Sequence, residues 1–173
     1  ACARSADALD AVAEDVREAG GEAVVQRADV RDEYDVERLM ETAAREGGTI
    51  DAVFANAGVY HGEPGDTALT EESYAAFDEH VRTNGRGVFT TVREAVPHLA
   101  DGARVVVPSG AVARDATAGF GSYAASKALA EAIARQFAAE LAHPVGVVDP
   151  GQVTTGLTDG MAGRDPADVA PMF

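Results

Sequence analysis

Short apolar segments alternate with segments of helical periodicity along this chain, and this alternation limits the folds open to it more than any other feature. Strands are predicted at residues 23–26, 50–55, 104–107 and 145–148, and helices at residues 5–19, 32–46, 71–99 and 122–141. The third helix is expected to be interrupted near Thr83-Asn84-Gly85. Continuously apolar strands separated by helices are typical of a parallel sheet covered on both faces. The sequence therefore predicts an α/β fold with a doubly wound parallel sheet in a three-layer α/β/α arrangement.

The composition limits the kinds of partner that the chain can bind. No internal repeat or low-complexity linker divides the 173 residues, so residues 1–173 are expected to form a single domain. The 29 acidic residues outnumber the 14 Lys and Arg, which gives a formal net charge of −15. Because this charge repels phosphates, neither nucleic acid nor an anionic membrane surface is expected as a partner. Cys2 is the only cysteine and no apolar run could cross a bilayer, which favours a cytoplasmic location.

The basic residues are strongly skewed, because Lys127 is the only lysine. An acid-rich surface that is poor in lysine is typical of proteins that stay soluble in concentrated salt, where screening within about 3 Å at 1 M removes self-repulsion. A GC-rich genome, whose codons favour Arg, Ala, Gly and Asp, is the alternative explanation. The composition therefore suggests a halophilic host as a hypothesis that a salt titration can test.

The residues that follow each strand form the candidate ligand site. In a parallel sheet of this kind, ligands bind outside the carboxyl ends of the strands. The segments found there are Asp29-Val30, Asn56-Ala57-Gly58, Ser109-Gly110 and Pro150-Gly151. Each could be an ordinary turn. Together, their small residues allow a close approach of the backbone to a bound dinucleotide.

Tyr123 and Lys127 form the candidate catalytic pair. They are four residues apart in Tyr123-Ala124-Ala125-Ser126-Lys127, which places a phenol and an ammonium one helical turn apart on the same face. A nearby cation stabilises a phenolate and moves its pKa toward neutrality, where it can exchange a proton with a carbonyl or alcohol oxygen. Such a spacing also occurs by chance, but here it coincides with the only lysine of the chain.

Four motifs occur in a fixed order. They are Ala55-Asn56-Ala57-Gly58, the asparagine of Val81-Arg82-Thr83-Asn84-Gly85, the pair Tyr123 and Lys127, and Pro150-Gly151-Gln152-Val153-Thr154-Thr155. They resemble the NNAG, asparagine, YxxxK and PGxVxT motifs of the short-chain dehydrogenase/reductase family, single-domain Rossmann-type oxidoreductases that use a nicotinamide cofactor. The resemblance extends from one end of the chain to the other.

The resemblance implies a role for each matching residue. Tyr123 would be the general acid/base, and Lys127 would bind the nicotinamide ribose and lower the tyrosine pKa. Asn84 would hold a water in a proton relay, and Asp29 would touch the adenine with Val30 packing beside it. The other cofactor-binding residues would be Asn56, Ala57, Gly58, Pro150, Gly151, Val153 and Thr155, the last of which would meet the carboxamide.

The catalytic serine of the family departs from the usual pattern. Its position is occupied by Gly110, and Ser109 comes one residue earlier. A shift of one residue in the loop could bring the Ser109 hydroxyl to the site, and Ser109 is therefore the candidate. Without it, the site would lack an oxyanion donor, a loss that typically costs about 10²–10³ in turnover. Pro108 is expected to end its strand, because proline cannot donate to the ladder.

A second departure concerns the glycine-rich phosphate loop, which does not occur in this sequence. The chain opens at Ala1-Cys2-Ala3-Arg4, which resembles the end of the family's second strand, and its last residues resemble the approach to the family's final helix. The expectation is a fragment truncated at both ends, lacking roughly 30 or more residues of a first βα unit. In the family topology, that first strand lies between the second and the fourth. Residues 154–163 are expected to form a mobile lid over Tyr123.

Cofactor preference is inferred from the end of the second strand. An acidic residue there would bind the ribose hydroxyls of NAD, whereas a basic residue would pair with the phosphate of NADP. Ala3 and Arg4 occupy this place, so NADP is expected, with NAD as the alternative. The histidines lack metal-ligand spacing, so they are interpreted as surface residues and no metal is expected; they are His61, His80, His98 and His143.

The sequence supports one main functional interpretation and two alternatives. The main interpretation is an NADP(H)-dependent oxidoreductase that interconverts a small-molecule ketone or aldehyde and an alcohol. By resemblance, the two long helices would pair across a two-fold axis in a homodimer or homotetramer. The first alternative is a non-catalytic or impaired dinucleotide-binding scaffold of the same fold. The second is an epimerase or dehydratase relative.

Overall fold

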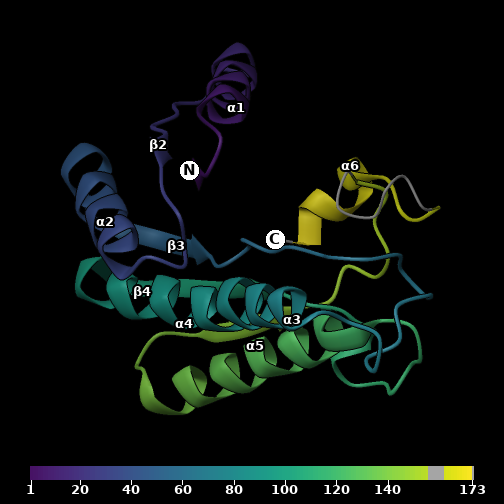
Figure 1. Ribbon diagram of the computed structural model, residues 1–173. Coiled ribbons are helices and arrows are strands. Elements are labelled where there is room, and N and C mark those ends of the chain that lie inside the picture. The colour runs from purple at the N-terminus through teal and green to yellow at the C-terminus, as the bar shows by residue number, and fades with distance from the viewer. Residues whose placement is uncertain (156–161, 173) are drawn as a thin grey trace.

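A computed structural model describes residues 1–155 and 162–172 (Figure 1). The strands are β1 (Cys2–Ala3), β2 (Gln26–Arg27), β3 (Ile50–Phe54), β4 (Leu99–Pro108) and β5 (Val145–Val148). The helices are α1 (Ala6–Glu18), α2 (Glu33–Gly47), α3 (Tyr74–His80), α4 (Gly87–Ala95), α5 (Gly121–Glu140) and α6 (Pro166–Val169). A π-helical turn over Val81–Arg86 joins α3 to α4, and short 3₁₀ turns occupy Val96–His98, Ala111–Ala113 and Ala170–Met172.

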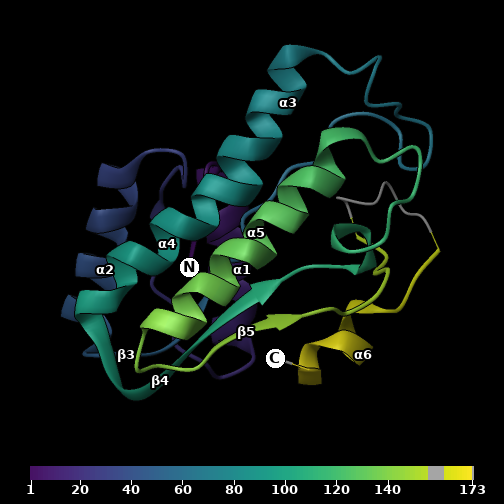
Figure 2. The same cartoon turned by 90° about the horizontal axis from the view of Figure 1, so that it is seen from below.

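All strand pairs are parallel, as expected from the apolar strands. The described strands form two sheets, with β1 beside β2 and with the order β3-β4-β5. The division falls between β1 and β3, the place that the resemblance assigns to the family's first strand. α4 and α5 run side by side against one face of β3-β4-β5, and α1 lies on the opposite side of the strands (Figures 1 and 2). The doubly wound α/β architecture is confirmed.

The helix boundaries follow local sequence signals. The Ser5 hydroxyl accepts a hydrogen bond from the N–H of Ala8, and the Asp32 carboxylate accepts from Tyr34 and Asp35, so both helices begin where a polar side chain caps them. The core between the β3-β4-β5 sheet and the helices is almost entirely aliphatic. Its most buried members are Val36, Val92, Ala95, Val105, Val107 and Ala130. No described helix has the length and apolar character needed to cross a bilayer.

The predicted strand at residues 23–26 and the predicted helix interruption near Asn84 both differ in detail from the structure. The strand expected at residues 23–26 is found at Gln26–Arg27, where it pairs with Cys2 and Ala3 of β1. The interruption expected near Asn84 is a π-helical widening and not a break, so the helix continues from α3 into α4. Gly85 lets α5 pack closely against this turn, since a Cβ here would lie 2.4 Å from Cδ2 of Leu129 and would force that side chain to move.

Candidate functional site

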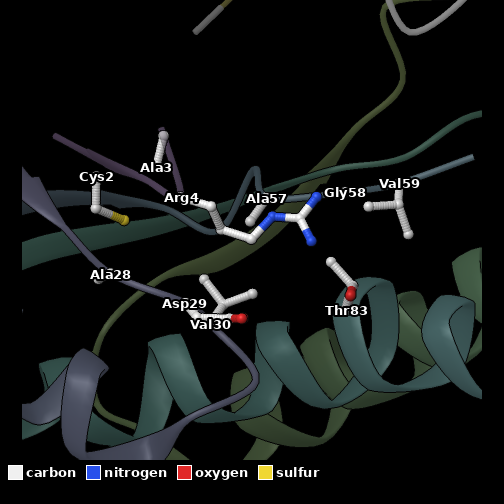
Figure 3. Close-up of a pocket in the computed structure, with 10 residues that line it drawn as sticks. All are labelled: Cys2, Ala3, Arg4, Ala28, Asp29, Val30, Ala57, Gly58, Val59 and Thr83. Carbon is white, nitrogen blue, oxygen red and sulfur yellow. The ribbon is translucent and has the colours of Figure 1, made fainter. Parts of the chain in front are cut away.

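A cavity of about 190 Å³ opens at the carboxyl ends of β1, β2 and β3 (Figure 3). Five of the predicted cofactor-binding residues line it: Arg4, Asp29, Val30, Ala57 and Gly58. It is also lined by Cys2, Ala3, Ala28, Val59 and Thr83, none of which the sequence analysis named as a cofactor-binding candidate. The position of Thr83, one residue before the motif asparagine on the π-helical turn, was the available signal.

The remaining predicted cofactor-binding residues lie outside this cavity. Asn56 is exposed two residues after the end of β3, and Pro150 and Gly151 follow β5. Val153 and Thr155 lie on the segment beyond, whose two ends are paired by a bridge between Val153 and Arg164. Residues 156–161, most of the expected lid, lie outside the described residues.

A second, larger cavity of about 610 Å³ lies along one face of α1, between Asp10, Glu14, Arg17 and Glu18. It contains none of the predicted site residues, and a single exposed helix face cannot enclose a ligand. The smaller cavity at the strand ends is therefore the candidate ligand site.

Charged side chains surround the cavity. The Arg31 guanidinium contacts the Asp29 carboxylate at 2.5 Å and Glu79 at 2.6 Å. Its hydrogen bonds to Asp29 lower the pKa of that carboxyl to about 2. Arg4 reaches across the opening, with its side chain 55% exposed and its guanidinium 3.5 Å from Glu79 (Figure 3). Among the described residues, the one ion pair of Arg4 is this long contact, whereas the Asp29 carboxylate is paired closely with Arg31.

Tyr123 and Lys127 lie one turn apart at the start of α5, as predicted. The Lys127 ammonium donates a hydrogen bond to the Pro108 carbonyl at 2.7 Å, which anchors it to the end of β4. Burial lowers the pKa of Lys127, and Glu131 opposes that shift. Burial, with a smaller contribution from Tyr60, raises the pKa of Tyr123. Lys127 is not among the causes of this shift, so the lowering of the tyrosine pKa by Lys127 stays a prediction.

Ser109 follows Pro108, which is the last residue of β4, as expected. The side chain of Ser109 is buried, and its hydroxyl has no hydrogen-bond partner among the described residues. Gly110 is extended, with a φ of −166°. A Cβ at Gly110 would meet no atom within 4 Å. Ser109 therefore offers an unused buried hydroxyl at the end of the strand to which Lys127 is anchored.

Asn84 is buried in the π-helical turn and uses most of its amide in contacts within the protein. Its Oδ1 accepts from the N–H of Val59 at 2.8 Å, and its Nδ2 donates to the Val59 carbonyl at 3.0 Å and to the Ser126 hydroxyl at 2.9 Å. Because both amide hydrogens are engaged, only Oδ1 has capacity left for a water. The side chain ties the segment after β3 to α5.

His80 corrects one prediction from sequence, because it is completely buried and not a surface residue. Desolvation lowers its pKa, against the opposing effect of Glu72. Its ring lies beside those of Tyr60, His61 and Tyr123, with centroids 6.0, 5.1 and 6.0 Å away. Sequence reasoning missed this aromatic cluster, because its members come from separate segments. Among the described residues, no group of three or more His, Cys, Asp or Glu side chains is placed to hold a metal ion.

Comparison with known protein families and curated relatives identifies the type of protein. The family model for short chain dehydrogenase matches residues 1–164. The hydroxynaphthalene reductase-like protein Arp2 of Metarhizium brunneum is 33% identical over 155 residues, 87% of this chain and 57% of that protein. The short chain dehydrogenase/reductase AacuN of Aspergillus aculeatus is 34% identical over 160 residues, 90% of this chain and 59% of that protein. The chain thus spans less than two thirds of the length of these relatives.

Solved structures give the same result. An alcohol dehydrogenase from the archaeon Thermococcus sibiricus, complexed with 5-hydroxy-NADP, superposes with a TM-score of 0.86 at 26% identity, over 99% of this chain and 75% of that one. A short chain dehydrogenase/reductase from Burkholderia phymatum in complex with NAD superposes with a TM-score of 0.83 at 25% identity, over 96% and 60% of the two chains. Similar structures therefore include complexes with either type of cofactor.

Proposed function

This chain belongs to the short-chain dehydrogenase family, and from that premise we propose that it is an NADP(H)-dependent oxidoreductase that interconverts a ketone or aldehyde and an alcohol. The observation that carries the proposal is that Lys127 and the Ser109 hydroxyl lie at the end of β4, with Tyr123 one turn before Lys127 on α5. Lys127 is hydrogen-bonded to Pro108, Tyr123 lies one turn before it on α5, and the adjoining Ser109 hydroxyl is buried without a partner among the described residues.

The proposed reaction requires a proton and a hydride. The bound cofactor supplies the hydride, which is added to the carbonyl carbon in the reductive direction. Tyr123 donates its phenolic proton to the carbonyl oxygen, and the raised pKa of Tyr123 keeps that proton on the phenol at neutral pH. The Ser109 hydroxyl would donate a hydrogen bond to the same oxygen and stabilise its developing charge. In the oxidative direction the tyrosine takes the proton back.

The cavity at the ends of β1, β2 and β3 fits the adenosine end of a dinucleotide. Its wall is formed partly by small residues, including Ala57 and Gly58, so the backbone can approach a ligand closely. We assign the ribose phosphate of NADP to Arg4, because its guanidinium lies at the cavity and its ion pair among the described residues is the long 3.5 Å contact to Glu79. Guanidinium groups bind phosphate in a bidentate manner. NAD remains the alternative cofactor.

The surface of α4 and α5 supports assembly into a homodimer or homotetramer. Phe89 on α4 is 41% exposed and Leu129 on α5 is 38% exposed, although both helices pack against the sheet. Phe89 also stacks on Phe137 of α5, with ring centroids 6.0 Å apart. Pairing of these helices with their copies would bury this apolar surface.

Replacement of Tyr123 by Phe tests the proposal. The variant should lose about 10²–10⁴ in kcat, because it has no phenolic proton to transfer. Its NADPH affinity, measured by fluorescence titration with NADH for comparison, should change by less than about twofold, since the ring is retained. Tyr74→Phe is the matched control, because Tyr74 is 93% exposed on α3.

The substrate screen should begin with aromatic ketones, because the Tyr60 ring lies 4.7 Å from that of Tyr123.

Either of two results would contradict the proposal. Unchanged turnover in Tyr123→Phe would remove the tyrosine from the mechanism. Saturable cofactor binding without turnover of any carbonyl or alcohol would favour the non-catalytic scaffold. Product analysis separates the oxidoreductase from an epimerase or dehydratase, because only the first reaction changes the amount of reduced cofactor.

A further inference from the structure

A carboxylate from outside α5 closes the first turn of that helix. Phe120, the residue before α5, supplies no side-chain cap. Instead, Oε2 of Glu72 accepts a hydrogen bond from the backbone N–H of Ser122 at 2.7 Å. The Glu72 side chain is only 4% exposed, so the contact is shielded from solvent. Glu72 therefore does for α5 what a local capping residue normally does.

Gly121 permits this close approach of the carboxylate. Its φ is +48°, a region that residues with a side chain rarely adopt. A Cβ at Gly121 would lie 2.9 Å from Oε2 of Glu72. The glycine thus leaves room for the carboxylate at the backbone of the helix start.

His80 holds the same residue of α5 through its side chain. Nε2 of His80 accepts a hydrogen bond from the backbone N–H of His61 at 2.9 Å, so the ring hydrogen of the neutral imidazole is on Nδ1. Nδ1 lies 2.7 Å from the Ser122 hydroxyl and 3.2 Å from Oε1 of Glu72. The imidazole therefore contacts the Ser122 hydroxyl, and the carboxylate contacts the Ser122 backbone N–H.

Ser122 is the residue immediately before the candidate proton donor. From the other side, the Ser126 hydroxyl donates to the Tyr123 carbonyl at 2.7 Å. The His80 ring also lies edge-on to the phenol, at an interplanar angle of 70°. The backbone that carries Tyr123 is therefore held at both ends of the first turn by buried polar contacts.

We propose that Glu72 and His80 are positioning residues, which fix the first turn of α5 and thereby the direction of the Tyr123 phenol. Both ring nitrogens of His80 and Oε2 of Glu72 are engaged with Ser122 and with the His61 backbone. Oε1 of Glu72 is buried without a hydrogen bond among the described residues and lies 3.2 Å from His80 Nδ1, so neither side chain is placed to exchange a proton with substrate. The inference rests on the proposed function, in which Tyr123 transfers the proton. A displacement of a reacting group by about 1 Å can cost about 10²-fold in rate.

Replacements at Glu72 test the proposal. Glu72→Ala should lower kcat by about 10- to 100-fold, while the KM for the cofactor stays within about twofold. Glu72→Gln should recover most of kcat, because its amide oxygen can still accept the Ser122 N–H. Glu71→Ala is the matched control: it removes the same charge from the adjacent, exposed position and should behave as the wild type.

A second measurement reports on the contact without any substrate. Amide hydrogen exchange at Ser122 and Tyr123 should be faster in Glu72→Ala than in the wild type, and unchanged in Glu71→Ala, because the capped N–H becomes free. If the wild-type protein turns over no carbonyl or alcohol, the proposed function fails, but this exchange measurement still tests the contact. Equal exchange at Ser122 in Glu72→Ala and the wild type would overturn the inference.

A comparison of turnover in two conservative variants, Glu72→Asp and Glu72→Gln, keeps the inference testable if Glu72→Ala does not fold. Glu72→Asp keeps the charge but shortens the side chain, so it should lose the Ser122 contact, whereas Glu72→Gln keeps the reach. We expect Gln to retain more turnover than Asp at equal cofactor affinity. An active Asp variant with an inactive Gln variant would mean that charge and not positioning matters, and a folded Glu72→Ala with wild-type kcat would overturn the inference directly.

Discussion

The amide nitrogen of Asn84 and the hydroxyl of Ser126, 42 residues apart in the chain, are joined by a buried hydrogen bond of 2.9 Å. The same Asn84 side chain pairs with both backbone polar groups of Val59, and the Ser126 hydroxyl donates a hydrogen bond to the Tyr123 carbonyl. One side chain on the π-helical turn therefore connects the segment after β3 with the turn of α5 that carries the candidate proton donor.

Replacement of Asn84 by Ala should therefore be costly for stability. The change leaves the Val59 N–H and carbonyl and the Ser126 hydroxyl without this partner, and we expect a loss of about 2–4 kcal/mol in the free energy of unfolding. Urea unfolding measures it. Ser126→Ala removes one of the three Asn84 hydrogen bonds, together with the Ser126 contact to the Tyr123 carbonyl, and should cost less, about 1 kcal/mol. A loss in Asn84→Ala no larger than that of Ser126→Ala would show that the Val59 contacts contribute little.

Ser109 should separate activity from stability. Its buried hydroxyl has no partner among the described residues, so Ser109→Ala should leave the free energy of unfolding within about 0.5 kcal/mol of the wild type or raise it. The same change should lower kcat by about 10²–10³, because the substrate oxygen loses a hydrogen-bond donor. Thermal unfolding and steady-state kinetics on one preparation measure both effects.

Gly110 provides the complementary experiment. A side chain at this position meets open space and an extended backbone, so Gly110→Ser should fold normally. Added to Ser109→Ala, it restores the serine at the position where the family pattern has it, and part of the lost turnover should return. If Ser109→Ala alone keeps full turnover, the shifted serine has no role in the reaction.

Burial of His80 predicts a specific pH dependence of stability. Its pKa is lowered in the folded protein from the ordinary value of 6.5, so below that pH the unfolded chain binds a proton that the folded protein excludes. The free energy of unfolding should therefore fall as the pH is lowered from 6.5, with a slope of up to about 1.4 kcal/mol per pH unit. In His80→Asn, urea unfolding between pH 7 and pH 5 should show a smaller fall. An identical fall in both proteins would assign the effect to other groups.

Salt should stabilise the protein if its acidic surface is an adaptation to salt. The net charge is −15, and the exposed residues Asp10, Glu14 and Glu18 place like charges one turn apart on α1. The urea midpoint should rise between 0.1 M and 1 M KCl, as the screening length falls from about 10 Å to about 3 Å. Glu14→Lys should reduce this rise. A midpoint that does not depend on KCl would favour codon bias as the origin of the composition.

The sequence by itself determined the features that depend on local spacing. Apolar strands alternating with helices specified the parallel α/β architecture, and Ser5 and Asp32 marked the beginnings of two helices because their side chains cap the adjacent backbone. The interval from Tyr123 to Lys127 fixed both residues on one face of α5, because a helix has 3.6 residues per turn. The chemistry that the four motifs imply could be proposed on this basis alone.

Only the tertiary structure decided the properties that depend on residues distant in sequence. β2 lies at Gln26–Arg27 because these residues pair with Cys2 and Ala3 of β1, which come from a distant part of the chain. Burial of His80 beside Glu72 and Ser122 has no local signal, because three separate segments create the environment that desolvates the imidazole. The raised pKa of Tyr123 has the same origin. A spacing places two groups on one face, but the packing around them sets their protonation.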